Sequence, residues 1–149
     1  MVDITSKPDS YREATARGRI KLKPETVRRI REGRVEKGDV EQVASVAAIM
    51  AVKRTPEILP LCHPLPITGV KVTFSYGPDH VEAVVTVKTT AKTGVEMEAL
   101  TGVTVALLTV WDMVKQYEKD ERGQYPTTRI EGVEVVEKVK MTPGASPSS

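Results

Sequence analysis

The pattern of apolar and polar residues along the chain predicts four strands. Small or apolar residues alternate with polar ones over 13–22, over 70–74 and over 81–87. A period of two is typical of half-buried strands, and the turn sequence 76–80 between the second and third runs predicts an antiparallel hairpin. A last alternating run, built on Ile130, Val133 and Val135, predicts the final strand.

Three other segments have helical spacing. Residues 24–32 predict a short basic helix that begins at Pro24 and ends at Gly33. Residues 39–54 predict a helix capped by Asp39. Over 95–117 the apolar positions surround most of the helical circumference, which predicts a buried central helix. Four prolines within 56–66 predict a rigid loop.

The order strand, helix, helix, two strands, helix, strand favours an α+β fold, with one antiparallel sheet and helices packed on one face. The 149 residues are enough for one domain with a sizeable core. We assign this domain to residues 1–142. The Pro-, Gly- and Ser-rich residues 143–149 are expected to form a disordered tail.

Composition restricts the chemistry and the compartment. A single cysteine, Cys62, excludes an intrachain disulfide and any all-cysteine zinc or iron–sulfur site. Only 4% of the residues are aromatic, which disfavours a protein that stacks nucleic-acid bases. The first residues lack the features of a signal peptide, and no apolar run approaches the ~20 residues of a membrane helix. These features predict a cytoplasmic protein without a membrane or nucleic-acid partner.

The net charge of +2 conceals a basic segment. Residues 12–37 carry ten basic and four acidic side chains, a local net charge of 10 − 4 = +6. Such a segment can recognise an anionic partner, or it can be an ordinary solvated face. The sequence contains no Gly-rich phosphate loop, so a phosphate would have to be held by charged side chains. The candidates for this role are Arg12, Arg17, Arg19, Lys37 and Lys53.

The predicted central helix carries two charged residues late in its apolar stretch. Asp112 and Lys115 are the only charged side chains from 99 to 115, and their i,i+3 spacing lets them form an ion pair. The surrounding residues predict that this pair is buried, where the cost of desolvation would need a functional reason. Proton exchange between the two side chains is one such reason.

The same helix begins with Glu96, Met97 and Glu98. Carboxylates in a first turn can serve the helix dipole alone, or they can belong to a site. If the helix is continuous, Glu98 and Asp112 face the same way but lie roughly 21 Å apart, at ~1.5 Å per residue. A single small site could not use both, so either the substrate is long or a second subunit contributes.

His63 is held among prolines beside the only cysteine, so it can be a functional residue as readily as a structural or solvated one. No second histidine or cysteine lies at metal-ligand spacing, so no metal site is predicted. We interpret Cys62 as a packing residue, because its only activating neighbour would be the imidazole of His63.

Several of these motifs occur together and in one order. They are Lys37-Gly38-Asp39-Val40, residues 51–55, Leu59-Pro60-Leu61-Cys62-His63-Pro64-Leu65, residues 92–101 with the core Gly94-Val95-Glu96-Met97-Glu98, and Trp111-Asp112-Met113-Val114-Lys115. Over 1–120 the chain resembles the cyclic pyranopterin monophosphate synthase family of molybdenum cofactor biosynthesis. The sequence differs from many members after residue 120, where 136–140 replace a glycine-rich basic segment.

The resemblance implies a ferredoxin-like subunit in a homohexamer, a trimer of dimers with sites at subunit interfaces. It implies a lyase that converts a cyclised GTP derivative, supplied by a radical enzyme, to the cyclic pyranopterin monophosphate with release of pyrophosphate. No cofactor is expected: a triphosphate can recruit Mg²⁺, but no carboxylate cluster in the sequence indicates a dedicated site for it. Asp112 and Lys115 correspond to catalytic residues. The residues that correspond to substrate-binding positions are Leu61, Cys62, His63, Glu96, Met97, Glu98, Arg12, Lys37 and Lys53.

A non-catalytic alternative remains open at this stage. An oligomeric module could hold a nucleotide or nucleic acid through the basic segment alone. Such a module would bind polyanions in a salt-sensitive way that does not depend on Asp112 or Lys115.

Overall fold

The computed structural model describes residues 1–141 and contains one four-stranded antiparallel sheet. The strands are β1 (Ser10–Lys21), β2 (Ile67–Tyr76), β3 (His80–Ala91) and β4 (Arg129–Met141), in the spatial order β2-β3-β1-β4. The predicted hairpin is β2–β3, with a shorter turn than expected because His80 is already paired in β3. The predicted tail, 143–149, lies outside the described residues.

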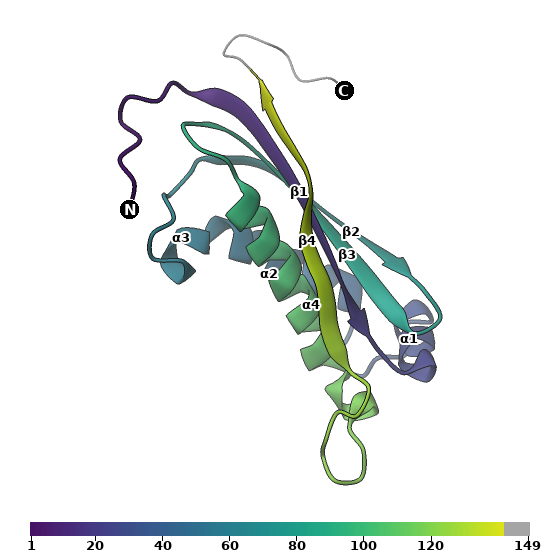
Figure 1. The fold of residues 1–149 in the computed structure, drawn as a ribbon. Coiled ribbons are helices and arrows are strands. Elements are labelled where there is room, and N and C mark those ends of the chain that lie inside the picture. The colour runs from purple at the N-terminus through teal and green to yellow at the C-terminus, as the bar shows by residue number, and fades with distance from the viewer. Residues whose placement is uncertain (142–149) are drawn as a thin grey trace.

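The helices are α1 (Pro24–Arg31), α2 (Val40–Lys53), α3 (Thr55–Ile58) and α4 (Glu96–Glu118). In Figure 1, α2 and α4 lie side by side across one face of the sheet, and α1 lies at the end where β1 finishes. Along the chain, β1 is followed by α1, α2 and α3, then by the β2–β3 hairpin, α4 and β4. This order of elements is the ferredoxin-like arrangement. The expectation of an α+β fold with helices on one face is confirmed.

Local chemistry explains most of the helix ends. Pro24 occupies the first turn of α1, where its missing N–H costs no hydrogen bond. The Asp39 carboxylate accepts a hydrogen bond from the backbone N–H of Gln42 at 3.0 Å and caps α2. The proline-rich segment is not entirely a loop, because Pro56 fits the first turn of the short α3.

Two glycines let α4 lie close to its neighbours. A Cβ on Gly102 would stand 2.8 Å from Val52 Cγ2 of α2 and 3.2 Å from Val85 Cγ1 of β3. A Cβ on Gly18 in β1 would stand 2.9 Å from Leu107 Cδ1 of α4. The core between the helices and the sheet therefore depends on small residues at its closest contacts.

The expectation that α4 is buried around most of its circumference is wrong for the single chain. Its inner face packs on the sheet and on α2, but Met97 and Leu108 on its outer face are 42% and 56% exposed. By length and composition alone, α4 passes the test for a helix that could cross a membrane. A core helix passes the same test, and half of the most apolar window of α4 is buried in the core.

Candidate functional site

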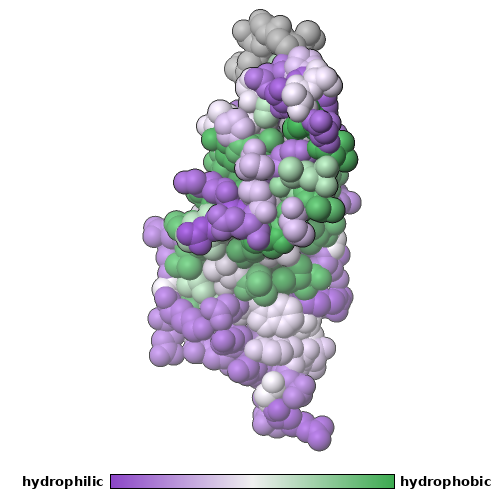
Figure 2. Space-filling view, turned by 90° about the vertical axis from the view of Figure 1, so that its left-hand side faces the viewer, coloured by the Kyte–Doolittle hydropathy of each residue, from purple (hydrophilic) through white to green (hydrophobic). Residues whose placement is uncertain are grey.

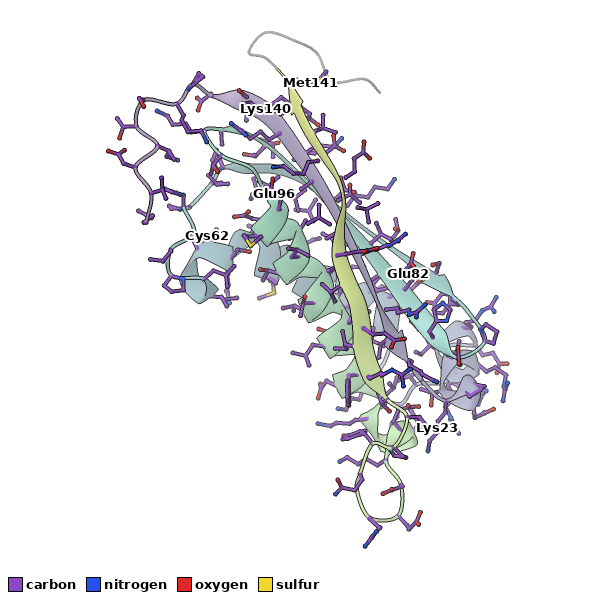
Figure 3. The ribbon with its side chains drawn as sticks, in the orientation of Figure 1. Lys23, Cys62, Glu82, Glu96, Lys140 and Met141 are labelled. Atoms are coloured by element: carbon purple, nitrogen blue, oxygen red, sulfur yellow. The ribbon has the colours of Figure 1, made fainter. Side chains whose placement is uncertain are left out.

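Six of the predicted site residues meet in one pocket at the N-terminal end of α4. The pocket has a volume of about 670 Å³ and lies between the proline-rich segment, the first turn of α4 and the chain's first residues. Figure 3 shows Cys62 and Glu96 on the two sides of this region. The predicted residues that line it, the Cys62 pocket from here on, are Leu61, Cys62, His63, Glu96, Met97 and Glu98.

Glu98 is the buried acid of the Cys62 pocket. Its side chain is almost fully buried, and its Oε1 has no hydrogen-bond partner within residues 1–141. Burial raises the pKa of Glu98, because the charged form loses its hydration. The residue can therefore hold a proton more readily than an exposed glutamate.

Cys62 contacts this acid directly. The thiol donates a hydrogen bond to Glu98 Oε2 at 3.5 Å. Burial and the neighbouring carboxylate raise the pKa of Cys62 to about 11. The thiol therefore stays protonated near neutral pH, which agrees with a packing role and argues against a nucleophile.

Arg12 and Lys138 flank Glu96 at the edge of the pocket. Arg12 donates hydrogen bonds to the carbonyls of Ala91 and Lys92, each at 3.3 Å. Lys138 Nζ of β4 lies 2.7 Å from Glu96 Oε1. Burial alone would raise the pKa of Glu96, but the net shift is downward, because the hydrogen bond and charge of Lys138, the residue's own backbone N–H and the charge of Arg12 together outweigh burial.

Lys138 is the residue that sequence reasoning missed. It lies in the segment that differs from the resembling family, and nothing in its immediate sequence marks it. Only its place on β4, opposite Ala14 of β1, brings it to the end of α4. A register prediction between β1 and β4 could have found it.

The ring of His63 faces the beginning of the chain. Its Nε2 lies 2.8 Å from the Val2 carbonyl, which can only accept, so Nε2 carries the hydrogen of this contact. Lys92 Nζ donates to the Thr5 carbonyl at 3.0 Å. These two bonds fasten residues 2–5 against the pocket.

A second group of predicted residues meets near the C-terminal end of α4. Asp112 Oδ1 lies 3.0 Å from Lys115 Nζ and 3.7 Å from Lys37 Nζ, and Lys37 also donates to the Asp112 carbonyl at 2.8 Å. Lys37 comes from the loop between α1 and α2, 75 residues away in sequence. We call Lys37, Asp112 and Lys115 the lysine cluster.

The expectation that this ion pair is buried is wrong for the single chain. Asp112 and Lys115 keep 62% and 43% of their side-chain surface exposed. Both lie on the outer face of α4, whereas the apolar residues around them in sequence turn inward. The hydrogen bond from Lys115 lowers the pKa of Asp112, and the same bond raises the pKa of Lys115. Near neutral pH the pair is a carboxylate beside an ammonium group.

The two groups of residues lie at opposite ends of one continuous helix. Because α4 runs from Glu96 to Glu118 without interruption, Glu98 and Asp112 are separated by roughly 21 Å along its axis. Within one chain the Cys62 pocket and the lysine cluster are therefore separate.

Other predicted phosphate-binding residues lie elsewhere. Lys53 is exposed at the end of α2 and makes no hydrogen bond or ion pair with the residues in 1–141. Arg17 and Arg19 form ion pairs with Glu134 and Glu131 of β4, at 2.6 and 3.0 Å. Much of the basic segment thus neutralises carboxylates of the same chain.

Among residues 1–141, no three His, Cys, Asp or Glu side chains are grouped so that they could hold a metal ion.

The sequence is similar to known proteins over nearly its whole length. Residues 1–140 match the model of the MoaC family. A protein of Pyrococcus horikoshii is 65% identical over 140 residues, which cover 94% of this chain and 88% of the relative. Proteins of Pyrococcus furiosus and Methanocorpusculum labreanum are 61% and 59% identical, over 94% and 96% of this chain and 90% of each relative. All three bear the name probable cyclic pyranopterin monophosphate synthase. The chain belongs to the MoaC family.

Proposed function

We propose that this protein is a cyclic pyranopterin monophosphate synthase, a lyase of molybdenum cofactor biosynthesis. It converts a cyclised dihydro-GTP to cyclic pyranopterin monophosphate and releases pyrophosphate. Membership of the MoaC family and the names of the relatives support this activity. The single structural observation that carries it is the lysine cluster, which the fold assembles from two distant segments.

The reaction needs proton transfers at the rearranging rings and stabilisation of phosphate charge. In the proposed mechanism Lys115, a protonated ammonium group, donates protons, and the Asp112 carboxylate keeps it charged and oriented. When the cyclic phosphate closes, a substrate hydroxyl loses its proton to solvent water and attacks the α-phosphorus. The bond between that phosphorus and the oxygen that bridges it to the β-phosphate breaks, and pyrophosphate leaves. Lys37 then stabilises the charge that develops on the phosphate oxygens.

The Cys62 pocket supplies the remaining contacts. Arg12 and His63 are proposed to bind the triphosphate, and Glu98 is proposed to hold a proton for the ring rearrangement. Leu61 and Met97, both exposed, would contact the substrate through apolar surface. Lys53 stays a proposed substrate contact. We propose no resident cofactor, and a chelator titration of the purified enzyme tests a requirement for Mg²⁺.

The separation along α4 favours a site shared between subunits. With roughly 21 Å between Glu98 and Asp112, one chain's pocket would be completed by the lysine cluster of another. A surface suited to such contact exists: Figure 2 shows hydrophobic residues gathered on the side of the molecule that carries α2, α3 and α4. The exposed apolar side chains of α2 and α4, the apolar helix face from here on, are Val43, Val46, Ile49, Met50, Met97 and Leu108.

A patch of this kind on the outer faces of two helices is typical of a subunit interface. It supports the proposed homohexamer, a trimer of dimers. The proposed location is the cytoplasm, where the chain would act after the radical enzyme that makes its substrate. The ion pairs of the basic segment favour this small-molecule enzyme over a nucleic-acid module.

The decisive experiment supplies the cyclised GTP derivative from the radical enzyme to the purified protein. We expect pyrophosphate release together with a product of the mass of cyclic pyranopterin monophosphate. Absence of both products from folded, assembled protein with authentic substrate would refute the proposed activity.

A further inference from the structure

The loop that carries Lys37 is tied to the last turns of α4. Residues 32–39 connect α1 to α2, and Gly33 and Gly38 have positive φ angles of 68° and 123° near its two ends. Within the loop only Val35 is buried in the core. The position of the Lys37 backbone therefore depends on contacts made by its neighbours.

Tyr117 makes the central contact. The backbone N–H of Glu36 donates a hydrogen bond to the Tyr117 hydroxyl oxygen at 2.9 Å. The bond fixes the Val35–Glu36 peptide group, which is one peptide group before the one that joins Glu36 to Lys37. Gln116 adds a second connection, because its Nε2 donates to Glu36 Oε2 at 3.0 Å.

Arg29 holds the other side of the same tyrosine. Its guanidinium carbon lies 4.5 Å from the centroid of the Tyr117 ring, and its Nη1 donates to the Arg34 carbonyl at 3.4 Å. Tyr117 thus lies between a cation from α1 and the backbone of the loop. The ring is part of the core packing, whereas the hydroxyl is used for the loop.

Lys37 needs such support more than Lys115 does. Lys115 projects from a rigid helix, but Lys37 projects from a loop on a flexible four-carbon side chain that is 42% exposed. A displacement of about 1 Å of a catalytic group can cost on the order of 100-fold in rate. The hydrogen bond between the Glu36 amide and the Tyr117 hydroxyl limits the displacement of Lys37, because it holds the backbone of the loop that carries the lysine.

We propose that Tyr117 is a positioning residue, which acts through the Glu36 amide to hold Lys37 against Asp112 and Lys115. The inference rests on the proposed function, because it assigns Tyr117 a role in that reaction. The proposed role belongs to the hydroxyl oxygen of Tyr117 alone. It is therefore distinct from the packing role of the Tyr117 ring.

The test is Tyr117→Phe, which removes the hydroxyl and keeps the ring. We expect kcat to fall by about tenfold or more, since Lys37 is displaced from its productive position, with a smaller change in KM. The Glu36 amide should exchange its hydrogen about fivefold faster or more, corresponding to the loss of one hydrogen bond. Tyr11→Phe is the matched control, because it removes a hydroxyl that donates to Glu13 within β1 at 2.9 Å and makes no hydrogen bond to the Lys37 loop. It should leave kcat and Glu36 exchange unchanged.

A second measurement separates positioning from general damage. In a Lys37→Arg background, where the tip of the side chain already differs, adding Tyr117→Phe should lower kcat by less than it does in the wild type. An active wild type whose kcat is unaffected by Tyr117→Phe overturns the positioning role and leaves the proposed function intact. Equal losses in the two backgrounds also overturn it. An inactive wild type overturns both.

Discussion

Asp112 Oδ1 and Lys115 Nζ lie 3.0 Å apart on the outer face of α4, one turn from each other and open to solvent. Their apolar sequence neighbours suggested burial, but those neighbours turn toward the sheet and α2. In the isolated chain both side chains keep much of their hydration, so the ion pair has a small desolvation cost. The proposed shared site would change that, because a second subunit and the substrate would remove water from it.

Replacement of Asp112 by Asn should abolish most of the activity. The amide carries no negative charge, so Lys115 Nζ loses the ion pair that holds it 3.0 Å from Asp112 Oδ1, and the proton donor is no longer oriented. We expect kcat to fall at least about 100-fold, with little change in substrate binding. The measurement is product formation from the cyclised GTP derivative, with Asp79→Asn in the β2–β3 turn as control. Near-normal turnover of Asp112→Asn would refute the catalytic assignment.

Glu98→Gln should change how stability depends on pH. Because burial raises the pKa of Glu98 above its ordinary 4.5, the folded chain binds this proton more tightly than the unfolded chain does. Above about pH 4.5 the Glu98 carboxyl therefore ionises in the unfolded chain before it ionises in the folded chain, and this stabilises the unfolded state. The free energy of unfolding falls as the pH rises toward the folded pKa of Glu98.

The glutamine variant lacks this loss. Its free energy of unfolding relative to wild type should increase between pH 4.5 and neutral pH, measured by urea denaturation at equal protein concentration. Glu57→Gln, at an exposed position of α3, is the control and should show no such trend. A difference between Glu98→Gln and wild type that stays constant with pH would contradict the assignment of a raised pKa.

Lys138→Met should separate stability from activity. The Lys138–Glu96 pair is exposed on the lysine side, so its loss should change the free energy of unfolding by less than about 1 kcal/mol. Removing its charge should nevertheless raise the pKa of Glu96 and weaken the pocket's hold on a triphosphate. We expect KM to rise about tenfold, since a hydrogen bond to a charged group contributes roughly 1.5–3 kcal/mol. Lys71→Met on β2, at the opposite edge of the sheet, should have a normal KM. An unchanged KM in Lys138→Met would exclude Lys138 from the site.

Val46→Asp should weaken assembly. Val46 is 58% exposed and has the largest exposed fraction in the apolar helix face, and an aspartate there would have to be buried without a partner in an interface. Light scattering should show a smaller assembly than the wild-type protein, while circular dichroism shows the fold retained. Activity should fall with the assembly, because the proposed site needs two chains. A Val46→Asp protein that keeps the wild-type mass would show that this face is not the interface.

Local sequence signals were sufficient for most of the fold. Period-two alternation found the β2–β3 hairpin, and the Asp39 cap found the start of α2, because both depend on residues close together in the chain. The helical turn of α3 was missed, since Pro56 reads as a breaker although the first turn of a helix accepts it. The grouping of Cys62 and His63 with Glu96 and Glu98 came from the family resemblance and not from periodicity.

The sequence by itself therefore determined the elements, their order, the family motifs and the spacing that separates Glu98 from Asp112 along one helix. Only the tertiary structure decided that Asp112 is exposed, that Lys37 reaches it and that Lys138 meets Glu96. The reason is that these outcomes depend on sheet register and on which face of a helix is covered. Two register shifts between β1 and β4 change which side chains of β4 face the helices, and no local pattern records such a shift.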